Sequence, residues 1–477
     1  MSDLMHREVL KHANLLKKYS STLIYDYTEY PTKGVWEHAY GHADYCAALA
    51  DWIPSSEPTL LYVHTPFCEE LCYFCLCSKS ITKDYSRVKS YLDDLLASEI
   101  SLLAASVRNS GFKLNVKEIY FGGGSPTYYS ENDFAELCAR LADIVDFSRI
   151  ETFTVEVDPR RVDENKLLFY SRCGVNRLSF GVQDFDPLVQ KEINRIQPPK
   201  LLEELLTPRI RETFKTINFD LLVGLPRQTP ESMKNTIETV CRLKPTEVQP
   251  LYVHYKPGTR SYMTRMVRNV PMPDYYDRKA IYAEVVDGLL DGGYIRAGYE
   301  NFALPSDVLA NALDSGSATY NSLGTTTGAH TNFVSLGASA HGVFGDYYFQ
   351  NFYEIDKYGE CLKRGEFPIY RGLKLTFDDK VRRDLIKHFR IYDTLDKNRF
   401  NSKWKIDFDQ YFSDERQNLN EFISDGLLEN SGHSIRLTGL GREFTPRFCE
   451  IFDRYSDRPV FDNQVYIDTS QLRSRTA

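Results

Sequence analysis

Between residue 59 and about residue 300, short apolar runs alternate with stretches in which apolar residues recur at helical spacing. Apolar runs of strand length, bounded by polar or turn-forming residues, are typical of buried strands. Apolar residues at intervals of three and four are typical of helices that bury one face. The pattern predicts strands over residues 60–64, 117–121, 151–157, 177–182, 217–223 and 247–253, and helices over residues 85–103, 132–145, 164–172 and 230–243.

This alternation predicts an α/β fold. Consecutive strand–helix units form a parallel sheet whose crossover helices cover its faces. We expect the sheet to be either open or curled into a partial barrel. The carboxyl ends of its strands would then meet along one edge, where the βα loops of barrels carry their chemistry.

The flanking segments differ in character from this region. Residues 1–58 contain two amphipathic stretches that cannot form their own core, so we expect an N-terminal arm draped over the next unit, residues 59–300. Residues 301–369 are predicted to be a barrel extension and linker, in which the Ser-, Thr- and Gly-rich stretch 306–345 is a loop closing on a small-residue strand. Residues 370–457 predict a mainly helical, winged-helix-like lid, with helices at 378–392 and 408–424, and the polar tail 458–477 is predicted to be loose.

Composition narrows the class of protein. The chain has 477 residues, of which 13% are aromatic, and a formal net charge of -8. A negative chain has no electrostatic support for a nucleic-acid partner, whereas abundant Tyr and Phe suit a large flat ligand. No apolar run is long enough to span a bilayer, and the N-terminus has no signal-peptide core. We therefore expect a soluble, cytoplasmic protein that binds no membrane. We also expect a monomer.

Four of the ten cysteines lie in one short stretch after the first predicted strand. Cys68, Cys72, Cys75 and Cys77 follow Pro66, which ends that strand, and thiolates this close together suit a soft metal centre. The spacing favours an iron–sulfur cluster, because zinc sites usually pair two knuckles far apart in the sequence and no second knuckle follows. A zinc site that uses all four cysteines, and buried thiols without a ligand role, are the alternatives.

Glycines and polar residues follow successive predicted strands at their carboxyl ends. Taken singly, each is as typical of a turn or a cap as of a ligand contact. Together they favour a ligand-binding rim. Arg195 and His341 carry weaker signals, because a helical arginine is usually solvated and a histidine is often a buried core residue. The rim residues are Gly122, Gly123, Gly124, Ser125, Glu156, Gln183 and Asp220.

The spacing Cys-x3-Cys-x2-Cys, with the aromatic Phe74 before the third cysteine, resembles the radical S-adenosylmethionine (SAM) superfamily. Longer stretches resemble the oxygen-independent coproporphyrinogen III dehydrogenase (oxidase) family, and the resemblance runs from the Tyr30-Pro31-Thr32 element through the terminal module. It implies a partial (β/α)6 barrel with a C-terminal lid. The stretches are YVHTPFCEELCYFCLC, YFGGGSPT, VEVDPR, NRLSFGVQDF, NFDLLVGLPRQTPES, SAHGVFGDYYFQN and RRDLIKHF.

The resemblance also implies roles for single residues. Cys68, Cys72 and Cys75 would ligate a 4Fe-4S cluster whose remaining iron is chelated by SAM, and Cys77 would be the family's extra, non-ligating cysteine at the catalytic centre. Tyr62, on the first strand, would lie near the SAM as a cofactor contact and a catalytic candidate. The other cofactor contacts would be Gly123, Gly124, Ser125, Glu156, Gln183, Arg195, Asp220, Val253 and His341.

The activity implied by the resemblance is the oxidative decarboxylation of coproporphyrinogen III to protoporphyrinogen IX in heme and porphyrin biosynthesis. In this chemistry an electron from the reduced cluster cleaves SAM to a 5'-deoxyadenosyl radical, which abstracts hydrogen from a propionate side chain. Loss of carbon dioxide and one electron then leaves a vinyl group. The implied partners are a tetrapyrrole substrate and an electron donor such as flavodoxin or ferredoxin.

The chain departs from this family in one segment. The dehydrogenases bind a second SAM through a glutamine and an isoleucine, and the matching positions here are Gly328 and His341. The resemblance therefore leaves a second SAM open, and two other functions stay in view. One is a radical methyl- or methylene-transferase acting on a tetrapyrrole or other aromatic substrate, favoured by the altered segment 325–342. The other is a heme-binding or heme-delivery protein, a branch that usually lacks a residue like Cys77.

Overall fold

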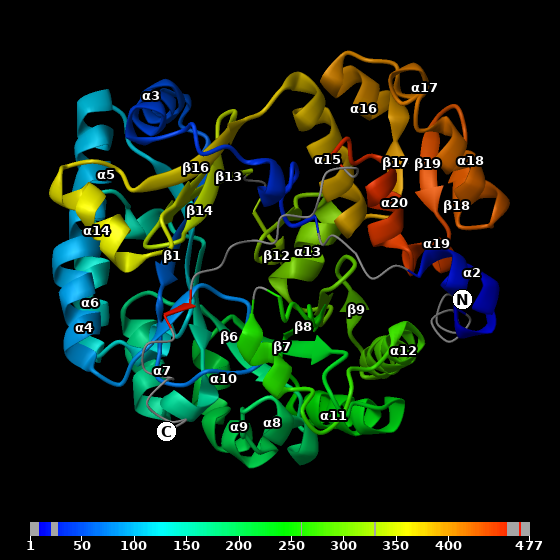
Figure 1. The fold of residues 1–477 in the computed structure, drawn as a ribbon, viewed down its shortest axis with the longest axis horizontal. Coiled ribbons are helices and arrows are strands. Elements are labelled where there is room, and N and C mark those ends of the chain that lie inside the picture. Colours follow the sequence, from blue (N-terminus) through cyan, green and yellow to red (C-terminus); the bar gives the residue numbers. More distant parts are fainter. Residues whose placement is uncertain (1–8, 21–26, 259, 329–330, 456–466, 469–477) are drawn as a thin grey trace.

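A computed structural model describes residues 9–20, 27–258, 260–328, 331–455 and 467–468. Its centre is a twelve-stranded sheet that contains a run of parallel strands in chain order (Figure 1). The predicted strands are confirmed to within a few residues. They are β1 (Pro58–Thr65), β4 (Asn115–Gly123), β5 (Thr152–Val157), β6 (Arg177–Gln183), β7 (Thr216–Val223) and β8 (Glu247–Tyr252).

Helices connect these strands and cover the sheet. The stretch predicted as a helix at 85–103 is longer than expected, because α4 (Tyr85–Ser90) continues through a π-helical turn (Tyr91–Leu96) into α5 (Ala97–Ser110). The predicted bounds of α7 (Glu164–Arg172) and α11 (Pro230–Leu243) are confirmed, since Asp163 and Thr229 cap their first turns. The other helices of this region are α6 (Glu131–Leu141), α8 (Pro187–Glu192), α9 (Pro199–Leu205), α10 (Pro208–Thr213) and α12 (Tyr275–Asp291).

The sheet continues past β1 and β8 on both sides. β13 (Asn332–Leu336) pairs in parallel with β1, and β14 (His341–Phe344), β15 (Tyr347–Asn351) and β16 (Ile369–Lys374) follow as antiparallel neighbours. Beyond β8 lie β10 (Phe302–Ala303) and β9 (Ile295–Arg296). The segment that the sequence predicts as a barrel extension thus supplies one edge of the sheet, and α14 (Ile355–Lys363) lies between β15 and β16 in the chain.

The loop predicted at 306–345 is wrong over much of its length. It contains α13 (Val308–Ser315) and the hairpin of β11 (Thr319–Asn321) and β12 (Gly324–Thr326). The carboxylate of Asp307 accepts a hydrogen bond from the Leu309 backbone N–H at 2.9 Å and so caps α13. The hairpin packs against α15 (Phe377–Ile391), a contact between distant segments that local composition does not reveal.

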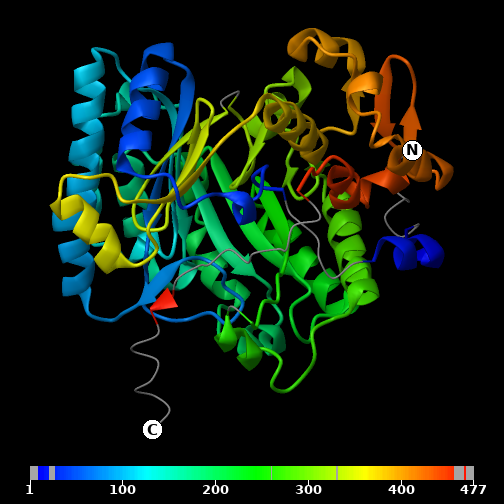
Figure 2. The ribbon, with the colours of Figure 1, turned by 45° about the horizontal axis from the view of Figure 1, so that its top comes forward.

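The N-terminal arm packs on two parts of the molecule. Val9, Leu16 and Tyr27 belong to the core of the C-terminal domain, whereas Trp52, at the end of α3 (His42–Trp52), is buried in the main core beside the sheet. Figure 2 shows α2 (Ala13–Tyr19) next to the C-terminal domain. The arm is therefore draped over more than the unit that follows it, because its apolar face meets aromatic side chains of the last domain.

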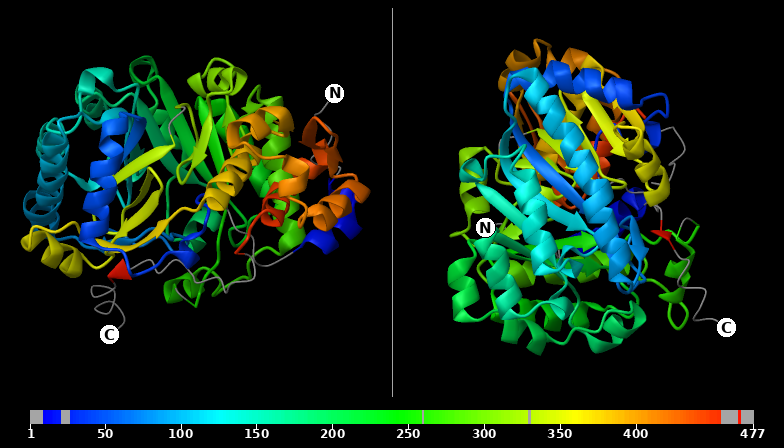
Figure 3. Two further views of the ribbon diagram at one scale, coloured as in Figure 1. Left: turned by 90° about the horizontal axis from the view of Figure 1, so that it is seen from above. Right: turned by 90° about the vertical axis from the view of Figure 1, so that its left-hand side faces the viewer.

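The C-terminal domain combines helices with a three-stranded sheet and lies at the opposite end of the molecule from α4 and α5 (Figure 3). The helix predicted at 408–424 is divided into α17 (Phe408–Tyr411) and α18 (Arg416–Ser424), and Glu415 between them forms an ion pair with Arg382 on α15 at 2.6 Å. Among the described residues, no helix is both long enough and apolar enough to cross a membrane. The remaining elements of this domain are α16 (Lys397–Trp404), α19 (Gly439–Arg442), α20 (Thr445–Ile451), β17 (Thr394–Asp396), β18 (Leu428–Asn430) and β19 (Ser434–Leu437).

Candidate functional site

The cysteine loop is held at both ends by backbone pairing. β2 (Phe67–Cys68) pairs in parallel with β3 (Lys79–Ile81), which also pairs with β20 (Ile467–Asp468). The Ser80 N–H donates to the Pro66 carbonyl at 2.7 Å, and the Thr82 N–H donates to the Cys68 carbonyl at 2.9 Å. These bonds fix where the loop leaves and rejoins the framework, and so limit how far its thiols can move.

Two cations lie beside the thiols of this loop. Arg195 Nη1 is 3.7 Å from Cys72 Sγ, and the ammonium of Lys79 donates to the Cys75 and Cys77 carbonyls at 3.4 and 3.5 Å. A hydrogen bond from Cys77 lowers the pKa of Cys75 well below its usual range, against the opposing effect of burial. Positive charge and hydrogen-bond donors favour thiolates, the form in which cysteine binds a metal. The loop therefore fits a thiolate-bound cluster.

Among the residues that the structure describes, no three His, Cys, Asp or Glu side chains converge as ligands of a single metal ion would. In a 4Fe-4S cluster each thiolate binds its own iron atom. Three cluster ligands therefore need not converge on one point.

A cavity of about 410 Å³ lies between the cysteine loop and the carboxyl ends of the parallel strands. It brings together nearly all of the residues that the sequence singles out, although they come from separate strand ends and loops. The predicted residues on its wall are Cys68, Cys72, Cys75, Cys77, Gly123, Gly124, Ser125, Glu156, Gln183, Arg195, Asp220 and Val253.

The glycine run is shaped by close packing at the end of β1. Gly123 has a φ of +104°, and a Cβ there would lie 2.3 Å from Cε1 of His64. A Cβ on Gly124 would lie 2.5 Å from the Phe67 carbonyl oxygen. Glycine is therefore required at both positions, and the backbone of this run forms part of the cavity wall.

Two half-buried carboxylates face the same cavity, and neither forms an ion pair with a described residue. Glu156 accepts hydrogen bonds from the Gly123 N–H at 2.9 Å and from Tyr120 Oη at 3.2 Å. Burial, and then the nearby charge of Asp220, raise the pKa of Glu156 to about 7. Asp220 accepts from Ser179 Oγ at 2.9 Å, and burial raises its pKa as well. A bound group that donates hydrogen bonds would stabilise both carboxylates.

The end of β6 is arranged around Arg195. Its guanidinium donates to the Gly181 carbonyl at 2.7 Å and lies 3.6 Å from the carboxylate of Asp158. Burial alone would raise the pKa of Asp158, but Arg195 and Arg160 lower it to about 2. Gln183 has a φ of +68°, which is uncommon for a residue with a side chain. Backbone strain of this kind is found at functional sites.

Tyr62 and His341 do not line this cavity. Tyr62 is buried beneath it, where its hydroxyl forms a hydrogen bond with His64 Nδ1 at 3.0 Å and its ring packs near Tyr120 and Phe333. His341 lies in the wall of a second cavity and contacts Glu29 of the N-terminal arm. The structure thus separates these two residues from the other predicted cofactor contacts.

Sequence reasoning missed Lys79 and Asp158. Lys79 is 2% exposed although it is a lysine, and its charge lies beside the cysteine loop. Its position two residues after Cys77 is the local signal that could have found it, because a cation near thiolates lowers their pKa. Asp158 lies two residues after Glu156, and its link to Arg195 depends on the fold.

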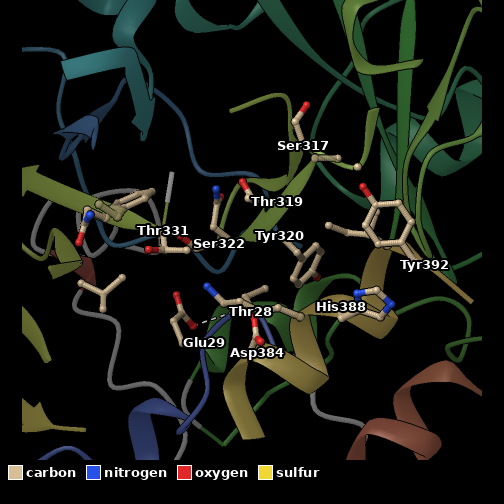
Figure 4. A pocket seen from close by; sticks show the side chains of 18 of the residues that line it. Thr28, Glu29, Ser317, Thr319, Tyr320, Ser322, Thr331, Asp384, His388 and Tyr392 are labelled. Carbon is tan, nitrogen blue, oxygen red and sulfur yellow. Dashed lines mark hydrogen bonds between the residues drawn. The ribbon is translucent and has the colours of Figure 1, made fainter. Parts of the chain in front are cut away.

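The second cavity, of about 530 Å³, lies between the arm, the β11–β12 hairpin and α15 (Figure 4). Thr28, Tyr320 and Ser322 line both cavities, so the two are neighbours with a shared wall. Asp384 and His388 face the second cavity from α15. The sequence gives no sign of this cavity, because its wall is assembled from segments more than 300 residues apart.

Two family models match the chain: the radical SAM superfamily over residues 62–240 and the HemN C-terminal domain over residues 375–444. The oxygen-independent coproporphyrinogen III oxidase of Pseudomonas aeruginosa is 34% identical over 431 residues, which cover 90% of this chain and 93% of that protein. The Escherichia coli protein of the same name is 33% identical over 429 residues, with 90% and 92% covered. The solved structure of coproporphyrinogen III oxidase from E. coli, described as a radical SAM enzyme, matches with a TM-score of 0.83 at 33% identity, and covers 90% of this chain and 97% of that one.

Proposed function

The chain belongs to the oxygen-independent coproporphyrinogen III oxidase family, and we propose that it is a radical SAM oxidoreductase that decarboxylates coproporphyrinogen III to protoporphyrinogen IX. One observation carries the proposal: a single cavity is lined by the cysteine loop, the glycine run and the buried carboxylates of Glu156 and Asp220. Sequence similarity over 90% of the chain supports the same reaction.

In this proposal Cys68, Cys72 and Cys75 hold a 4Fe-4S cluster, and SAM occupies the cavity beside it. When bound, this pair supplies a one-electron cleavage of SAM that yields a radical able to abstract hydrogen from a propionate side chain. The protein's part is to position the substrate carbon and exclude water. Arg195 and Lys79 support the proposal, because they place positive charge beside thiolates that must stay deprotonated.

Glu156 and Asp220 are proposed to accept hydrogen bonds from SAM. Each is half-buried and has a pKa raised by burial, which for Asp220 the charges of Arg177 and Arg195 only partly offset. A carboxylate that gains a charged or hydroxyl donor is stabilised in its ionised form. Gly123, Gly124 and Ser125 are proposed to receive the methionyl end, with Gln183, Arg195 and Val253 completing the contacts.

Cys77 is proposed to act at the catalytic centre and not as a cluster ligand. Its side chain is exposed, in contrast with that of Cys72, and it lines the same cavity. It therefore has access to the space where a substrate would lie. Tyr62 is proposed to influence the site indirectly. Its hydroxyl forms a hydrogen bond with His64, and His64 packs against Gly123 of the glycine run.

We also propose that the protein acts on a tetrapyrrole substrate and receives electrons from a donor such as flavodoxin or ferredoxin. We propose that it is a cytoplasmic monomer that binds one SAM beside the cluster. Gly328 and His341 occupy the positions at which the family contacts a second SAM. We propose no site for a second SAM here. Its binding would be detected as a stoichiometry of two SAM molecules per chain.

The test is an anaerobic reaction of reconstituted protein, SAM, a reductant and coproporphyrinogen III, with mass spectrometry of the products. We expect a porphyrinogen that has lost one or two carboxyl groups, together with 5'-deoxyadenosine. The Cys72→Ser chain is the control and should form neither. 5'-Deoxyadenosine beside an untouched porphyrinogen would overturn the substrate, S-adenosylhomocysteine would point to methyl transfer, and tight heme binding without SAM cleavage would point to heme delivery.

A further inference from the structure

The carboxylates that line the second cavity already have partners. Glu29 accepts from Thr28 Oγ1 at 2.7 Å, lies 3.5 Å from the Lys33 ammonium and contacts His341. Burial alone would raise the pKa of Glu29, but the charges of Lys33 and His341 lower it well below its usual range. This acid is fully compensated within the protein.

One of the two acids that the C-terminal domain contributes is paired in the same way. Asp384 accepts from the Lys403 ammonium and from Trp404 Nε1, both at 2.8 Å. Asp396 is exposed, caps α16 by accepting from the Arg399 backbone N–H at 3.0 Å, and forms no ion pair with a described residue. The two carboxylates whose charges act on Lys387, Glu29 and Asp384, are therefore already paired with other groups.

Two cations on α15 lack such a partner. Lys387 lines the cavity, and within the described part of the chain it forms no hydrogen bond and no ion pair. Arg383 precedes it by one helical turn and stacks over the ring of Tyr348, another wall residue, at 5.9 Å. Nη1 of Arg383 is buried and has no hydrogen-bond partner among the described residues. Lys387 therefore lines the cavity beside a second cation, Arg383, and neither forms an ion pair with a described residue, although the charges of Glu29 and Asp384 act on Lys387.

This arrangement destabilises the protein on its own. Like charges four residues apart on a helix repel each other, and a buried donor without an acceptor is unfavourable. Burial, and then the charge of Arg383, lower the pKa of Lys387 to about 7. An anionic oxygen placed between the two side chains would relieve the repulsion and satisfy both donors.

We propose that Lys387, supported by Arg383, is a carboxylate-binding subsite, and that it holds a propionate of the tetrapyrrole substrate remote from the one that reacts. This assignment rests on the proposed function. Thr28, Tyr320 and Ser322 line both cavities, so a macrocycle that lies across them has one edge at the cysteine loop and another at α15. Coproporphyrinogen III carries four propionates, which leaves three for such contacts.

The experiment measures binding without turnover. Cluster-loaded protein, kept anaerobic and without SAM, is titrated with coproporphyrinogen III, and bound and free porphyrinogen are separated by ultrafiltration. We expect Lys387→Met to weaken binding about tenfold or more, the loss of one charge-assisted hydrogen bond. Lys387→Arg should recover most of the affinity. The tetramethyl ester of the porphyrinogen, which has no carboxylates, should bind both wild type and the Met variant equally.

Lys380→Met is the matched control, because Lys380 lies on the same helix outside both cavities and already has a carboxylate partner, Asp346, at 2.9 Å. Its porphyrinogen affinity should change less than about twofold. Equal losses in the Lys387 and Lys380 variants would overturn the assignment to Lys387. So would an unchanged affinity in Lys387→Met, or an equal effect of that substitution on acid and ester.

Two further measurements separate this proposal from the proposed function and from another carboxylate ligand. If wild type binds coproporphyrinogen III through Lys387 but does not decarboxylate it, the subsite stands and the reaction is wrong. If wild type decarboxylates it and Lys387→Met has an unchanged KM, the reaction stands and the subsite is wrong. Labelled SAM is the third probe: a stoichiometry that falls from two to one in Lys387→Met, with porphyrinogen binding intact, would assign the subsite to a second SAM and overturn the tetrapyrrole assignment.

Discussion

The two cavities on either side of Tyr320 contain half-buried charges of opposite sign. The first has the carboxylates of Glu156 and Asp220 on its wall, and the second has Lys387 on its wall with Arg383 one helical turn away. None of these four side chains forms an ion pair with a described residue, although more distant opposite charges act on Asp220 and Lys387. Uncompensated buried charge lowers stability, and proteins retain it mainly at sites of function. Under the proposed function, this difference would suit the first cavity to a ligand that donates hydrogen bonds and the second cavity to a ligand that carries a carboxylate.

The largest effect should come from removing one cluster ligand, which disables the first cavity and leaves the second intact. We expect Cys72→Ser to lose iron and all 5'-deoxyadenosine formation, while binding of coproporphyrinogen III to the second cavity is largely kept. Iron analysis, the visible absorbance of the cluster and the binding titration measure this. The control is Cys138→Ser, a buried thiol outside the loop. Full iron content in Cys72→Ser would remove this residue from the ligand set.

The next largest effect is expected on SAM affinity when the carboxylate of Glu156 in the first cavity is removed. Replacing Glu156 by Ala should weaken SAM binding by about 1.5 to 3 kcal/mol, the range for a hydrogen bond to a charged group. Equilibrium dialysis with labelled SAM measures it. Glu151→Ala is the matched control, since Glu151 precedes the same strand at its far end and is 67% exposed. If Glu156→Ala binds SAM as wild type does, the first cavity is not complementary to SAM in the way proposed.

A third prediction compares Glu156 with a buried acid outside both cavities. Burial raises the pKa of Glu99 to about 7 as well, although Tyr358, Gly337 and Asn351 all donate to it. A raised pKa means that the folded state holds the proton more tightly, so stability is highest below about pH 4.5 and falls as the pH rises to about 7. Relative to Glu99→Gln, wild type should lose about 3 kcal/mol across this window.

Urea unfolding at a series of pH values, with and without SAM, tests this comparison. SAM should leave the pH response due to Glu99 unchanged, because that carboxylate lies between α5 and the β13–β15 edge of the sheet. The response due to Glu156, measured against Glu156→Gln, should be reduced by SAM. A SAM effect of equal size on both residues would contradict the assignment of Glu156 to the SAM site.

The smallest effect is on stability at the second cavity. Lys387→Met should stabilise the ligand-free protein by about 1 kcal/mol, because it removes a half-buried cation that forms no ion pair among the described residues and whose cost Glu29 and Asp384 only partly offset. The folded-state pKa of Lys387 is lowered, so the penalty is fully present below about pH 7 and disappears as the pH rises towards the pKa of the unfolded chain. The gain should therefore shrink at alkaline pH. Lys380→Met should show no gain, and a destabilised Lys387→Met would argue that the amine has a structural partner.

Local sequence was sufficient to predict the bounds of helices that begin at a recognisable capping residue. Asp163 and Thr229 mark the starts of α7 and α11, and both helices have their predicted bounds. The rim of the first cavity was also predictable, because parallel strands bring their carboxyl ends to one edge. Cys72, Glu156 and Asp220 could therefore be grouped, because Cys72 follows the first predicted strand and the two acids lie in the carboxyl-terminal halves of later strands.

What could not be predicted depends on contacts between distant segments. The β11–β12 hairpin needs α15 to pack against, so its Thr- and Gly-rich sequence indicates only a loop. Lys387 on a helix with a polar face is indistinguishable, in sequence, from a solvated lysine. His341 was grouped with the cofactor contacts, whereas the structure pairs it with Glu29, 312 residues earlier.

The N-terminal arm also limits how such proteins can be recombined. Tyr27 and Tyr30 are buried in the core of the C-terminal domain, and Trp36, a few residues later, belongs to an apolar cluster beside the sheet. A chimera that took its last domain from a relative would separate these tyrosines from the surface to which they are fitted. The N-terminal arm and the C-terminal domain therefore have to be exchanged together, and a chimera in which only one of them is replaced should be insoluble.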